Sequence, residues 1–360
     1  MISSLRLINF RNYSEFKITF PKNLICIVGD NASGKTNLIE ALFLLSHAKS
    51  FRAISDRDMI YDDKEIGRVS GKIIQLSNFQ LSNEKVDLEV VLTTGSVMGQ
   101  RVALKTFSIN GVGKRMVDFV GIFKTVLFWP EDLELVTGSP VKRRRYIDFV
   151  LSGVDREYRR TLISYEKGLR SRNKLLEAIR EGRAHRHQLI FWDQLLIKDG
   201  EYITSKRQEY IEYLNNIDTN GYKAEYDKSI ISRSRLDQYK DAEVAAGVTL
   251  VGPHRDDILI KIKDKREKIK DNEWKDLVRF GSRGEQRLSI LWLKLAELSY
   301  IEQITGEKPT LLLDDIFSEL DHEHREIVMK ACHSQQTIMT TTDKHFIENF
   351  PKGSMKVVQL

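Results

Sequence analysis

Hydrophobic and polar residues alternate near the start of the chain, with the period of a half-buried β-strand. Two such runs cover residues 5–10 and 16–20, and the polar stretch 11–14 between them predicts a turn. Residues 24–28 are wholly apolar and precede a glycine, which is typical of a buried strand in a sheet covered on both faces. Apolar residues then recur on one face of a predicted helix through residues 38–45.

Short alternating runs return between about residues 66 and 113 and predict a meander of antiparallel strands, with runs at 86–92, 102–104 and 107–109. The segment Gly111-Val112-Gly113-Lys114 lies in this region. It has the glycines and the lysine of a phosphate-binding loop but neither the spacing nor a following Ser or Thr. We therefore interpret it as a hairpin turn.

The pattern becomes helical and highly charged between about residues 142 and 217, where apolar residues recur mostly three and four positions apart. Gly182 interrupts it, so we expect two helices joined by a short polar break, in the form of an antiparallel arm. Strand-like patterning resumes near Val248 and alternates with helices to the end. The arm therefore separates two segments of an α/β fold.

Composition narrows the class of protein. The chain has 360 residues, of which 41% are hydrophobic, as in a globular protein with a packed core. No apolar run is long enough for a membrane span, and the start lacks the pattern of a secretory signal. Two cysteines, Cys26 and Cys332, cannot form a disulfide framework. These features favour a cytoplasmic protein, and the net charge of +6 is compatible with nucleic acid binding.

The strongest motif lies between the buried strand and the helix that follows it. The segment matches G-x-x-x-x-G-K-[ST] at every fixed position. Its glycines let backbone N–H groups surround an anion, and the helix N-terminus adds partial positive charge. We expect Lys35 to reach the β- and γ-phosphates of a nucleotide and the Thr36 hydroxyl to bind Mg²⁺. The predicted nucleotide-binding residues are Gly29, Asp30, Asn31, Ala32, Ser33, Gly34, Lys35, Thr36 and Asn37.

A second motif supplies the carboxylates that such a site needs. Residues 311–313 are apolar and lead into Asp314 and Asp315, the pattern of a Walker B strand. We expect Asp314 to hold Mg²⁺ and Asp315 to orient or deprotonate the attacking water, with Lys35 and Asp315 as catalytic residues. Two adjacent carboxylates repel each other, and a bound divalent cation removes that cost.

Residues 281–286 precede a strongly apolar helix and resemble the S-G-G-Q signature of the ABC ATPase superfamily, with Arg283 for one glycine and Glu285 for a glutamine. Residues 318–321 resemble its D-loop. In that superfamily the signature caps the nucleotide of a partner chain. The resemblance implies nucleotide-binding roles for Ser282, Gly284 and Asp321, although an ordinary capped helix start has the same residue types.

The long helical insertion between the phosphate loop and the signature favours the SMC-like branch of this superfamily over a transporter ATPase. We therefore expect an ABC/SMC-like ATPase head of α/β class with an inserted helical arm. The expected lobe comprises residues 1–125 and 246–360, and the expected arm comprises residues 126–245. The arm is too short for a long coiled coil.

Four further segments give a specific resemblance. Residues 7–13 (LINFRNY), 129–145, 252–257 (GPHRDD) and 313–321 are similar to motifs of the RecF family of bacterial recombination mediators, in the same order. Phe51 stands where many relatives have histidine, which leaves the role of that position open but not that of Arg52. The arm between about residues 151 and 245 carries no such motif.

The resemblance implies a slow, DNA-stimulated ATPase that binds ATP and Mg²⁺ and forms a homodimer on ATP and DNA. It implies binding to double-stranded, gapped or junction DNA, and action with RecR and RecO to load RecA in gap repair, replication-fork maintenance and the SOS response. Basic clusters are the candidate DNA contacts, although each could also be a solvated helix face. The candidates are Arg52 and three clusters: Lys142, Arg143, Arg144 and Arg145; Arg156, Arg159 and Arg160; and Arg180, Arg183 and Arg186 with His185 and His187.

Two other function classes fit the sequence less well. An ABC subunit of a membrane transporter is disfavoured by the insertion and by the FRNY opening. An ATPase–nuclease of the overcoming-lysogenisation type would need an acidic nuclease domain after the D-loop, where only about forty residues remain. Sequence leaves open whether His254 and Arg255 are core or phosphate-sensing residues, and whether His345 is a surface or a switch histidine.

Overall fold

The computed structural model describes residues 1–75, 84–217, 221–263, 274–319, 322–343 and 355–360. The chain forms two compact units. The first contains residues 1–132 and 297–360, and the second contains residues 133–296. Within the described residues, no helix combines the length and the apolar character that a membrane span requires.

An antiparallel sheet of six strands, in the order β2-β1-β4-β5-β8-β9, forms one layer of the first unit. The predicted meander is confirmed, and the glycine-rich segment at residues 111–114 belongs to the hairpin of β8 and β9. Residues 102–104, expected in a strand, instead lie between β7 and β8. The strands are β1 (Ile2–Phe10), β2 (Tyr13–Thr19), β4 (Ile66–Gln75), β5 (Glu84–Thr93), β8 (Lys105–Ile109) and β9 (Val112–Lys114), with a small separate hairpin of β6 (Ser96–Val97) and β7 (Gln100–Arg101).

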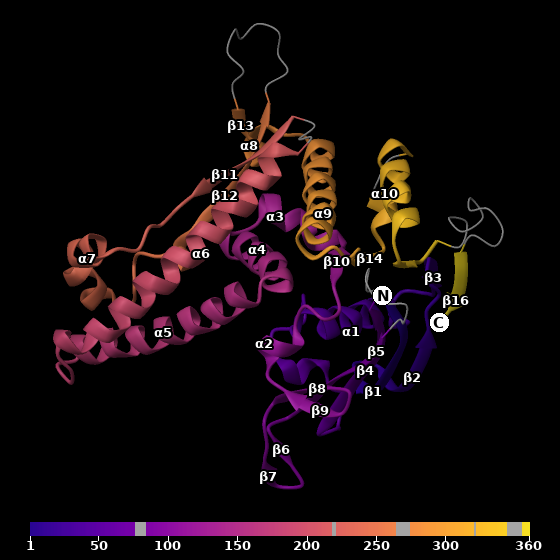
Figure 1. Ribbon diagram of the computed structural model, residues 1–360, viewed down its shortest axis with the longest axis horizontal. Coiled ribbons are helices and arrows are strands. Elements are labelled where there is room, and N and C mark those ends of the chain that lie inside the picture. Colours follow the sequence, from indigo (N-terminus) through magenta and orange to yellow (C-terminus); the bar gives the residue numbers. More distant parts are fainter. Residues whose placement is uncertain (76–83, 218–220, 264–273, 320–321, 344–354) are drawn as a thin grey trace, which may run out of the picture. The chain divides into compact units, whose positions relative to one another are not determined.

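A parallel sheet of five strands, in the order β10-β14-β15-β3-β16, forms the second layer (Figure 1). Its strands are β3 (Leu24–Val28), β10 (Thr125–Phe128), β14 (Thr310–Asp314), β15 (Thr337–Thr341) and β16 (Met355–Gln359). Every residue of β3, β10, β14 and β15 is buried, as the apolar runs at residues 24–28 and 311–313 predicted for β3 and β14. These strands come from the parts of the chain before and after residues 133–296, so the sheet joins the two segments of the first unit.

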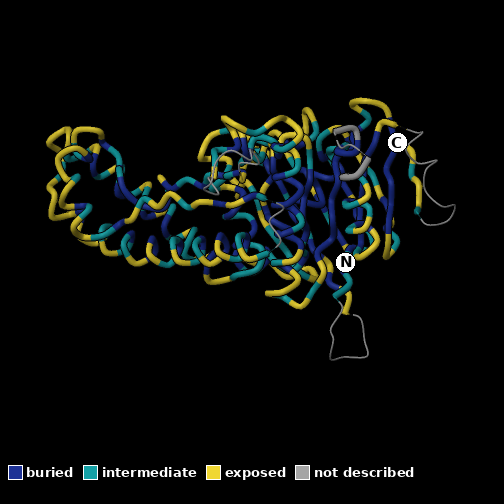
Figure 2. Tube along the Cα trace, turned by 90° about the horizontal axis from the view of Figure 1, so that it is seen from above, coloured by how far each residue is buried: buried dark blue, intermediate teal, exposed yellow. Residues whose placement is uncertain are grey.

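Helix α1 (Lys35–His47) lies between the two sheets, because it contacts β4 and β5 of the antiparallel sheet and β10, β14 and β15 of the parallel one. It is apolar nearly all round, which suits a helix covered on both sides. Figure 2 shows the resulting buried core in dark blue. The remaining helices of this unit are α2 (Met116–Phe119) and α10 (His322–Ser334).

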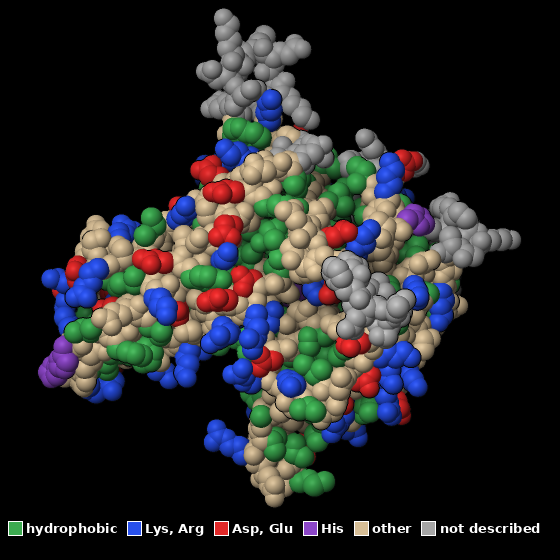
Figure 3. Space-filling view, viewed as in Figure 1, with side chains coloured by type: hydrophobic (Ala, Val, Ile, Leu, Met, Phe, Trp, Pro, Cys, Tyr) green, Lys and Arg blue, Asp and Glu red, His purple; other side chains and the backbone are tan. Residues whose placement is uncertain are grey.

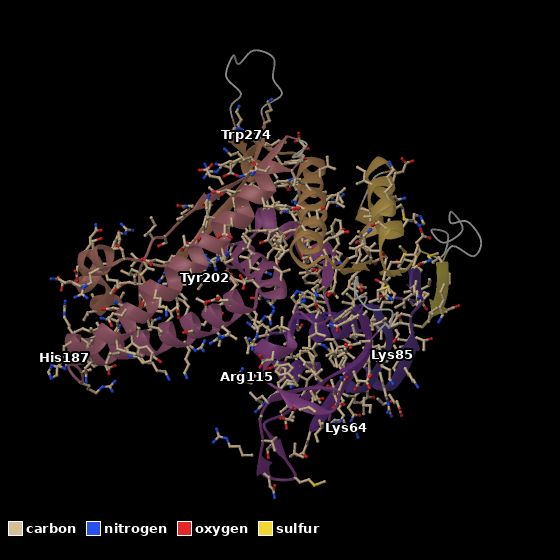
Figure 4. The ribbon with its side chains drawn as sticks, in the orientation of Figure 1. Lys64, Lys85, Arg115, His187, Tyr202 and Trp274 are labelled. Carbon is tan, nitrogen blue, oxygen red and sulfur yellow. The ribbon has the colours of Figure 1, made fainter. Side chains whose placement is uncertain are left out.

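The second unit contains the helical arm. Helices α5 (Arg156–Arg180) and α6 (Ile190–Asn216) pack against each other as the predicted hairpin (Figure 1), and His187 marks its free end (Figure 4). Gly182 lies in the turn with a φ of +73°, a conformation that favours glycine. The other helices are α3 (Glu134–Thr137), α4 (Pro140–Val154), α7 (Arg233–Ala246), α8 (Leu277–Phe280) and α9 (Arg283–Thr305), whose last residues continue into the first unit.

The division between lobe and arm differs from the one expected from the sequence. Residues 246–296 were expected in the ATPase lobe but belong to the second unit, and residues 126–132 belong to the first. The cause is a three-stranded antiparallel sheet of β11 (Tyr222–Asp227), β12 (Asp257–Lys263) and β13 (Trp274–Asp276). Strand β11 packs against α6 and β12 against α4, so this segment folds with the arm helices.

A buried polar cluster centred on Arg207 holds the second unit together. The guanidinium donates to both carboxylate oxygens of Asp148, to Asp256 at 2.9 Å and to the Pro253 carbonyl at 2.7 Å. The hydroxyls of Tyr158 and Tyr226 donate to Asp148 and Asp256 respectively. Residues of α4, α5, α6, β11 and the loop before β12 thus share one network. A buried charge is tolerated only when it is paired and hydrogen-bonded in this way.

We expect Arg207→Met to destabilise the protein strongly, because it leaves the half-buried Asp148 and the fully buried Asp256 carboxylates without their cation. Removing one partner of a buried pair costs about 3–5 kcal/mol. The matched control is Arg186→Met, which breaks the exposed Arg186–Asp241 pair and should cost less than about 1 kcal/mol. Calorimetric unfolding of both variants measures the difference, and equal melting temperatures would refute the structural role of Arg207.

Candidate nucleotide-binding site

The phosphate loop has the backbone geometry that anion binding requires. Ala32 and Gly34 have φ values of +65° and +108°, so the chain curls before it enters α1. A Cβ atom on Gly29 would lie 2.6 Å from the Ser33 hydroxyl, and one on Gly34 would lie 2.5 Å from the Tyr13 hydroxyl. A Cβ at either position would force a neighbouring side chain to move, and at Gly34 the positive φ also favours glycine; the N-terminus of α1 follows the loop directly.

Lys35 is buried, with 7% of its surface exposed, and its ammonium lies inside the loop. Its Nζ atom donates hydrogen bonds of 2.8 Å to the carbonyls of Gly29 and Asp30. A buried ammonium needs acceptors, and these carbonyls hold the lysine where a phosphate group would meet it. The contact of Lys35 with the phosphates of a nucleotide stays a prediction.

The structure brings together Thr36 and Asp314, the two predicted magnesium ligands, from the start of α1 and the end of β14. The side chain of Thr36 donates a hydrogen bond to Asp314, and Thr340 of the intervening β15 donates another at 2.6 Å. Burial raises the pKa of Asp314 above its ordinary value, and these two hydrogen bonds oppose that effect. A divalent cation would favour the charged form more strongly.

This donor set fits Mg²⁺ bound together with a nucleotide. Mg²⁺ in nucleotide sites takes one or two protein ligands and completes its shell with phosphate oxygens and water. In the part of the chain that the structure describes, no cluster of three or more His, Cys, Asp or Glu is arranged as a protein-only metal site. Thr36 and Asp314 are therefore the pair that would hold the ion, which would neutralise phosphate charge.

Asp315 follows Asp314 directly and adopts a positive φ of 53° at the end of β14. Its backbone N–H donates to the Thr340 hydroxyl at 3.2 Å, so β15 fixes the turn. Asp315 is half-buried, whereas Asp314 is almost fully buried. The two neighbouring carboxylates thus have different environments, which is what separate roles in metal binding and proton transfer require.

A buried glutamate that sequence reasoning missed organises the surroundings of the loop. Glu40 of α1 is fully buried and accepts two hydrogen bonds from Arg11, of 2.7 and 2.8 Å, and one from Arg52 at 2.9 Å. The Ser50 hydroxyl donates a fourth at 2.5 Å. Burial disfavours the charged form of Glu40, but these donors outweigh it and hold its pKa below the usual range. Glu40 therefore joins the β1–β2 turn to the segment after α1.

The β1–β2 turn and the segment after α1 also contact the residues of the phosphate loop and the first turn of α1. Asn37 donates to Asn12 at 2.6 Å and accepts from Arg52, while Asn12 donates to the Ser33 carbonyl at 3.4 Å. The buried hydroxyls of Tyr13 and Ser33 have no hydrogen-bond partner among the described residues. Orphaned donors beside a phosphate loop fit a site that binds an oxygen-rich ligand.

Phe51, whose role the sequence left open, is a core residue. Its ring is T-shaped against Phe43 of α1, with centroids 5.5 Å apart, and against Trp129, at 4.5 Å. The neighbouring Arg52 was expected to contact DNA. Its ion pair with Glu40 leaves 32% of the side chain exposed, so DNA contact by Arg52 stays a prediction.

Ser282, the predicted signature residue, lies at the start of α9 in the second unit. Its hydroxyl and backbone N–H donate to the Glu285 carboxylate at 2.9 and 2.8 Å, and the Glu285 N–H donates back to the hydroxyl. This is a capping box. Gly284 and Ser282 are both exposed, as a surface for a second chain requires. Asp321 of the predicted D-loop lies outside the described residues.

The basic cluster at residues 142–145 is largely engaged within the second unit. Arg143 forms two hydrogen bonds with Asp257, at 2.7 and 2.9 Å, and Arg144 donates to the Asp256 carbonyl. Lys142 pairs with Glu134, and Arg145 lies over the Phe149 ring. These contacts give the cluster a structural role, and its predicted contact with DNA stays a prediction.

The GPHRDD segment is also part of this packing. His254 shares hydrogen bonds with the Tyr165 hydroxyl at 2.8 Å and the Thr249 carbonyl at 3.1 Å, and burial lowers its pKa to about 4. Arg255 donates to the same carbonyl. Both residues therefore serve the fold of the second unit, and His345 lies outside the described residues.

The fold and the site define the chain as an ABC/SMC-like ATPase head. The family model of the RecF/RecN/SMC N-terminal domain matches residues 1–359. Solved Smc head domains share the fold, with TM-scores of 0.50 and 0.52 for two of them at 19% and 14% identity.

Relatives with higher sequence identity show to which family within this class the chain belongs. The DNA replication and repair protein RecF of Thermomicrobium roseum is 34% identical over all of this chain and 98% of its own length. That of Halalkalibacterium halodurans is 35% identical, over 97% of this chain and 94% of its own. A solved structure of the recombination mediator protein RecF-ATP in the RecFOR pathway matches with a TM-score of 0.83 at 31% identity, covering 95% of this chain and 92% of that one. The chain belongs to the RecF family.

We expect Glu40→Gln to lower stability by about 2–3 kcal/mol, somewhat less than the usual cost of breaking a buried pair, because Arg11 and Arg52 keep partial contact with water. The matched control is Glu15→Gln, which removes the same charge from the exposed Arg6–Glu15 pair and should cost less than about 1 kcal/mol. Parallel thermal unfolding is the measurement. Similar losses in both variants would show that Glu40 does not anchor this network.

Proposed function

We propose that this protein is an ATP-dependent DNA-binding protein of recombinational gap repair and replication-fork maintenance, with slow ATP hydrolysis as its switch. The single observation that carries the proposal is the meeting of Lys35, Thr36 and Asp314 at one end of the parallel sheet, in a chain that matches RecF over nearly its full length. A phosphate loop beside a Walker B carboxylate is the arrangement that hydrolyses nucleotides.

In this proposal each residue of the site has a separate task. Lys35 compensates the β- and γ-phosphate charges of bound ATP, and the backbone N–H groups of residues 29–36 surround them. Thr36 and Asp314 hold Mg²⁺, which supplies charge stabilisation when bound. Asp315 orients the attacking water and accepts its proton.

The proposed active unit is a homodimer. Ser282, Gly284 and Asp321 act on the nucleotide held by the partner's phosphate loop, so each composite site draws on two chains. Support comes from the exposed start of α9, where the hydroxyl of Ser282 and the end of a long helix are accessible. ATP binding then joins two chains, and hydrolysis at Asp315 releases them.

The proposed substrate is double-stranded, gapped or junction DNA in the cytoplasm, and the proposed partners are RecR and, downstream, RecO and RecA. The support is the family: the solved relatives are recombination mediators of the RecFOR pathway. The net charge of +6 agrees with a phosphate-rich ligand. Arg52 and the cluster at residues 142–145 remain candidate DNA contacts within this proposal.

Complementation between two inactive variants tests the composite site. Lys35→Met removes the phosphate-binding charge and Ser282→Arg blocks the signature, so each variant alone has two broken sites. A mixed dimer has one intact site. Because random pairing makes half of the dimers mixed, an equal mixture should regain about a quarter of the wild-type DNA-stimulated ATPase.

The control mixture pairs Lys35→Met with the double variant Lys35→Met/Ser282→Arg, whose mixed dimers have no intact phosphate loop and should stay inactive. Cross-linking of differently tagged chains confirms that mixed dimers form. An absence of recovered activity under those conditions would refute action of the signature on the partner's nucleotide.

A further inference from the structure

The exposed face of α5 carries a line of basic side chains that no sequence motif marks. Arg160, Lys167, Arg170 and Lys174 are all exposed, and the spacing of 7, 3 and 4 residues places them on one side of the helix. At 3.6 residues per turn they lie within about 80° of arc and span about 21 Å along the axis. We call these four residues the α5 basic stripe.

The opposite face of α5 explains why this side stays exposed. Tyr158, Tyr165, Gly168, Arg172 and Leu176 are buried, and α5 packs against α6 and α7. Figure 2 shows buried and exposed residues alternating along the arm helices, and Figure 3 shows Lys and Arg side chains along the edge of the arm that α5 forms. The stripe therefore points away from the body of the second unit.

The stripe differs from other basic residues of this unit in having no internal partners. None of its four side chains forms a hydrogen bond or an ion pair with any residue that the structure describes. By contrast, Arg143 pairs with Asp257, Arg172 with Glu243, and Arg159 is buried and donates to the Ser152 carbonyl. Four like charges on one helix face repel each other, and an anionic partner would remove that cost.

We propose that the α5 basic stripe binds the phosphate backbone of duplex DNA. A straight line of charges fits a duplex, which carries about one negative charge per 1.7 Å of its axis. Between the stripe residues, the same helix face has no aromatic side chain and a single apolar one, Ile163, whereas binding to a membrane surface would need an apolar helix face. Arginine and lysine on phosphates give affinity without base specificity, as a protein that acts at many genomic sites requires.

This inference rests on the proposed function, because it assumes that the protein binds duplex DNA, but it assigns that binding to a helix face of which only Arg160 was a candidate from the sequence. It implies that the arm, and not only the ATPase lobe, contributes to DNA affinity. It also implies that the contribution is electrostatic and disappears at high salt.

The test replaces all four residues by glutamine (Arg160→Gln, Lys167→Gln, Arg170→Gln, Lys174→Gln). The four positions are exposed and glutamine is compatible with a helix, so the fold should be retained. Unchanged circular dichroism and unchanged ATP affinity would verify this. Binding to a fluorescent duplex is measured between about 50 and 200 mM salt. We expect the slope of log affinity against log salt to shrink by about 3–4, near 0.9 for each lost phosphate contact, with at least about a tenfold loss of affinity at the lowest salt.

The matched control removes the same charge from four other exposed residues that have no side-chain partner in the described structure: Lys64, Lys198, Arg233 and Lys240, each replaced by glutamine. Figure 4 labels Lys64, which lies in the first unit. Both quadruple variants have a net charge of +2, because four charges are removed from +6. The control should keep a slope within about one of the wild type.

The outcomes separate this inference from the proposed function. Wild-type protein that fails to bind duplex DNA would overturn the proposed function itself. Wild-type protein that binds, together with a stripe variant whose slope matches that of the control variant, would overturn the stripe alone. The stripe could instead bind an acidic protein. In that case the stripe variant would lose binding to that protein but keep the wild-type salt slope on DNA, and this result would also overturn the proposed DNA contact.

Discussion

The nucleotide site depends on the parallel pairing of β15 with β3 on one side and with β14 on the other. This strand order brings together the carboxyl end of β3, from the first part of the chain, and the carboxyl ends of β14 and β15, from the last part. Thr36 and Asp314 meet there, and Thr340 bonds Asp314 from the strand between them. Because Asp314 is almost fully buried, its charged form needs those donors, and a divalent cation bound there would stabilise that form further.

A second constraint is that buried charges must find partners, and in this protein they do so across segments far apart in sequence. Glu40 joins Arg11 and Arg52 around the phosphate loop, and Arg207 joins Asp148 and Asp256 in the second unit. Each network ties three or more segments together through one central side chain. Charge that remains unpaired, as along α5, is therefore available for a ligand.

The sequence predicted what depends on local pattern. The phosphate loop, the apolar β14 and the amphipathic arm helices follow from spacing alone, because backbone geometry and burial of a single element determine them. It did not predict the role of Glu40, which lies within an apolar helix and is paired with arginines from two other segments of the chain. It also missed β11, whose six residues pair with β12 and move residues 246–296 out of the expected lobe. For the same reason the run of basic residues made Arg143 and Arg144 candidate DNA contacts. Their partners in the structure lie more than a hundred residues away, so the sequence could not show that they are paired.

The central claim is that ATP joins the phosphate loop of one chain to the signature of another. Sedimentation velocity of the Asp315→Asn variant tests it most directly, because an amide cannot accept the proton of the attacking water and ATP therefore stays bound. The account predicts monomers without nucleotide, dimers with Mg²⁺ and ATP, and monomers again when Ser282→Arg is added. Monomers at saturating ATP, or equal dimerisation with Ser282→Arg, would contradict it.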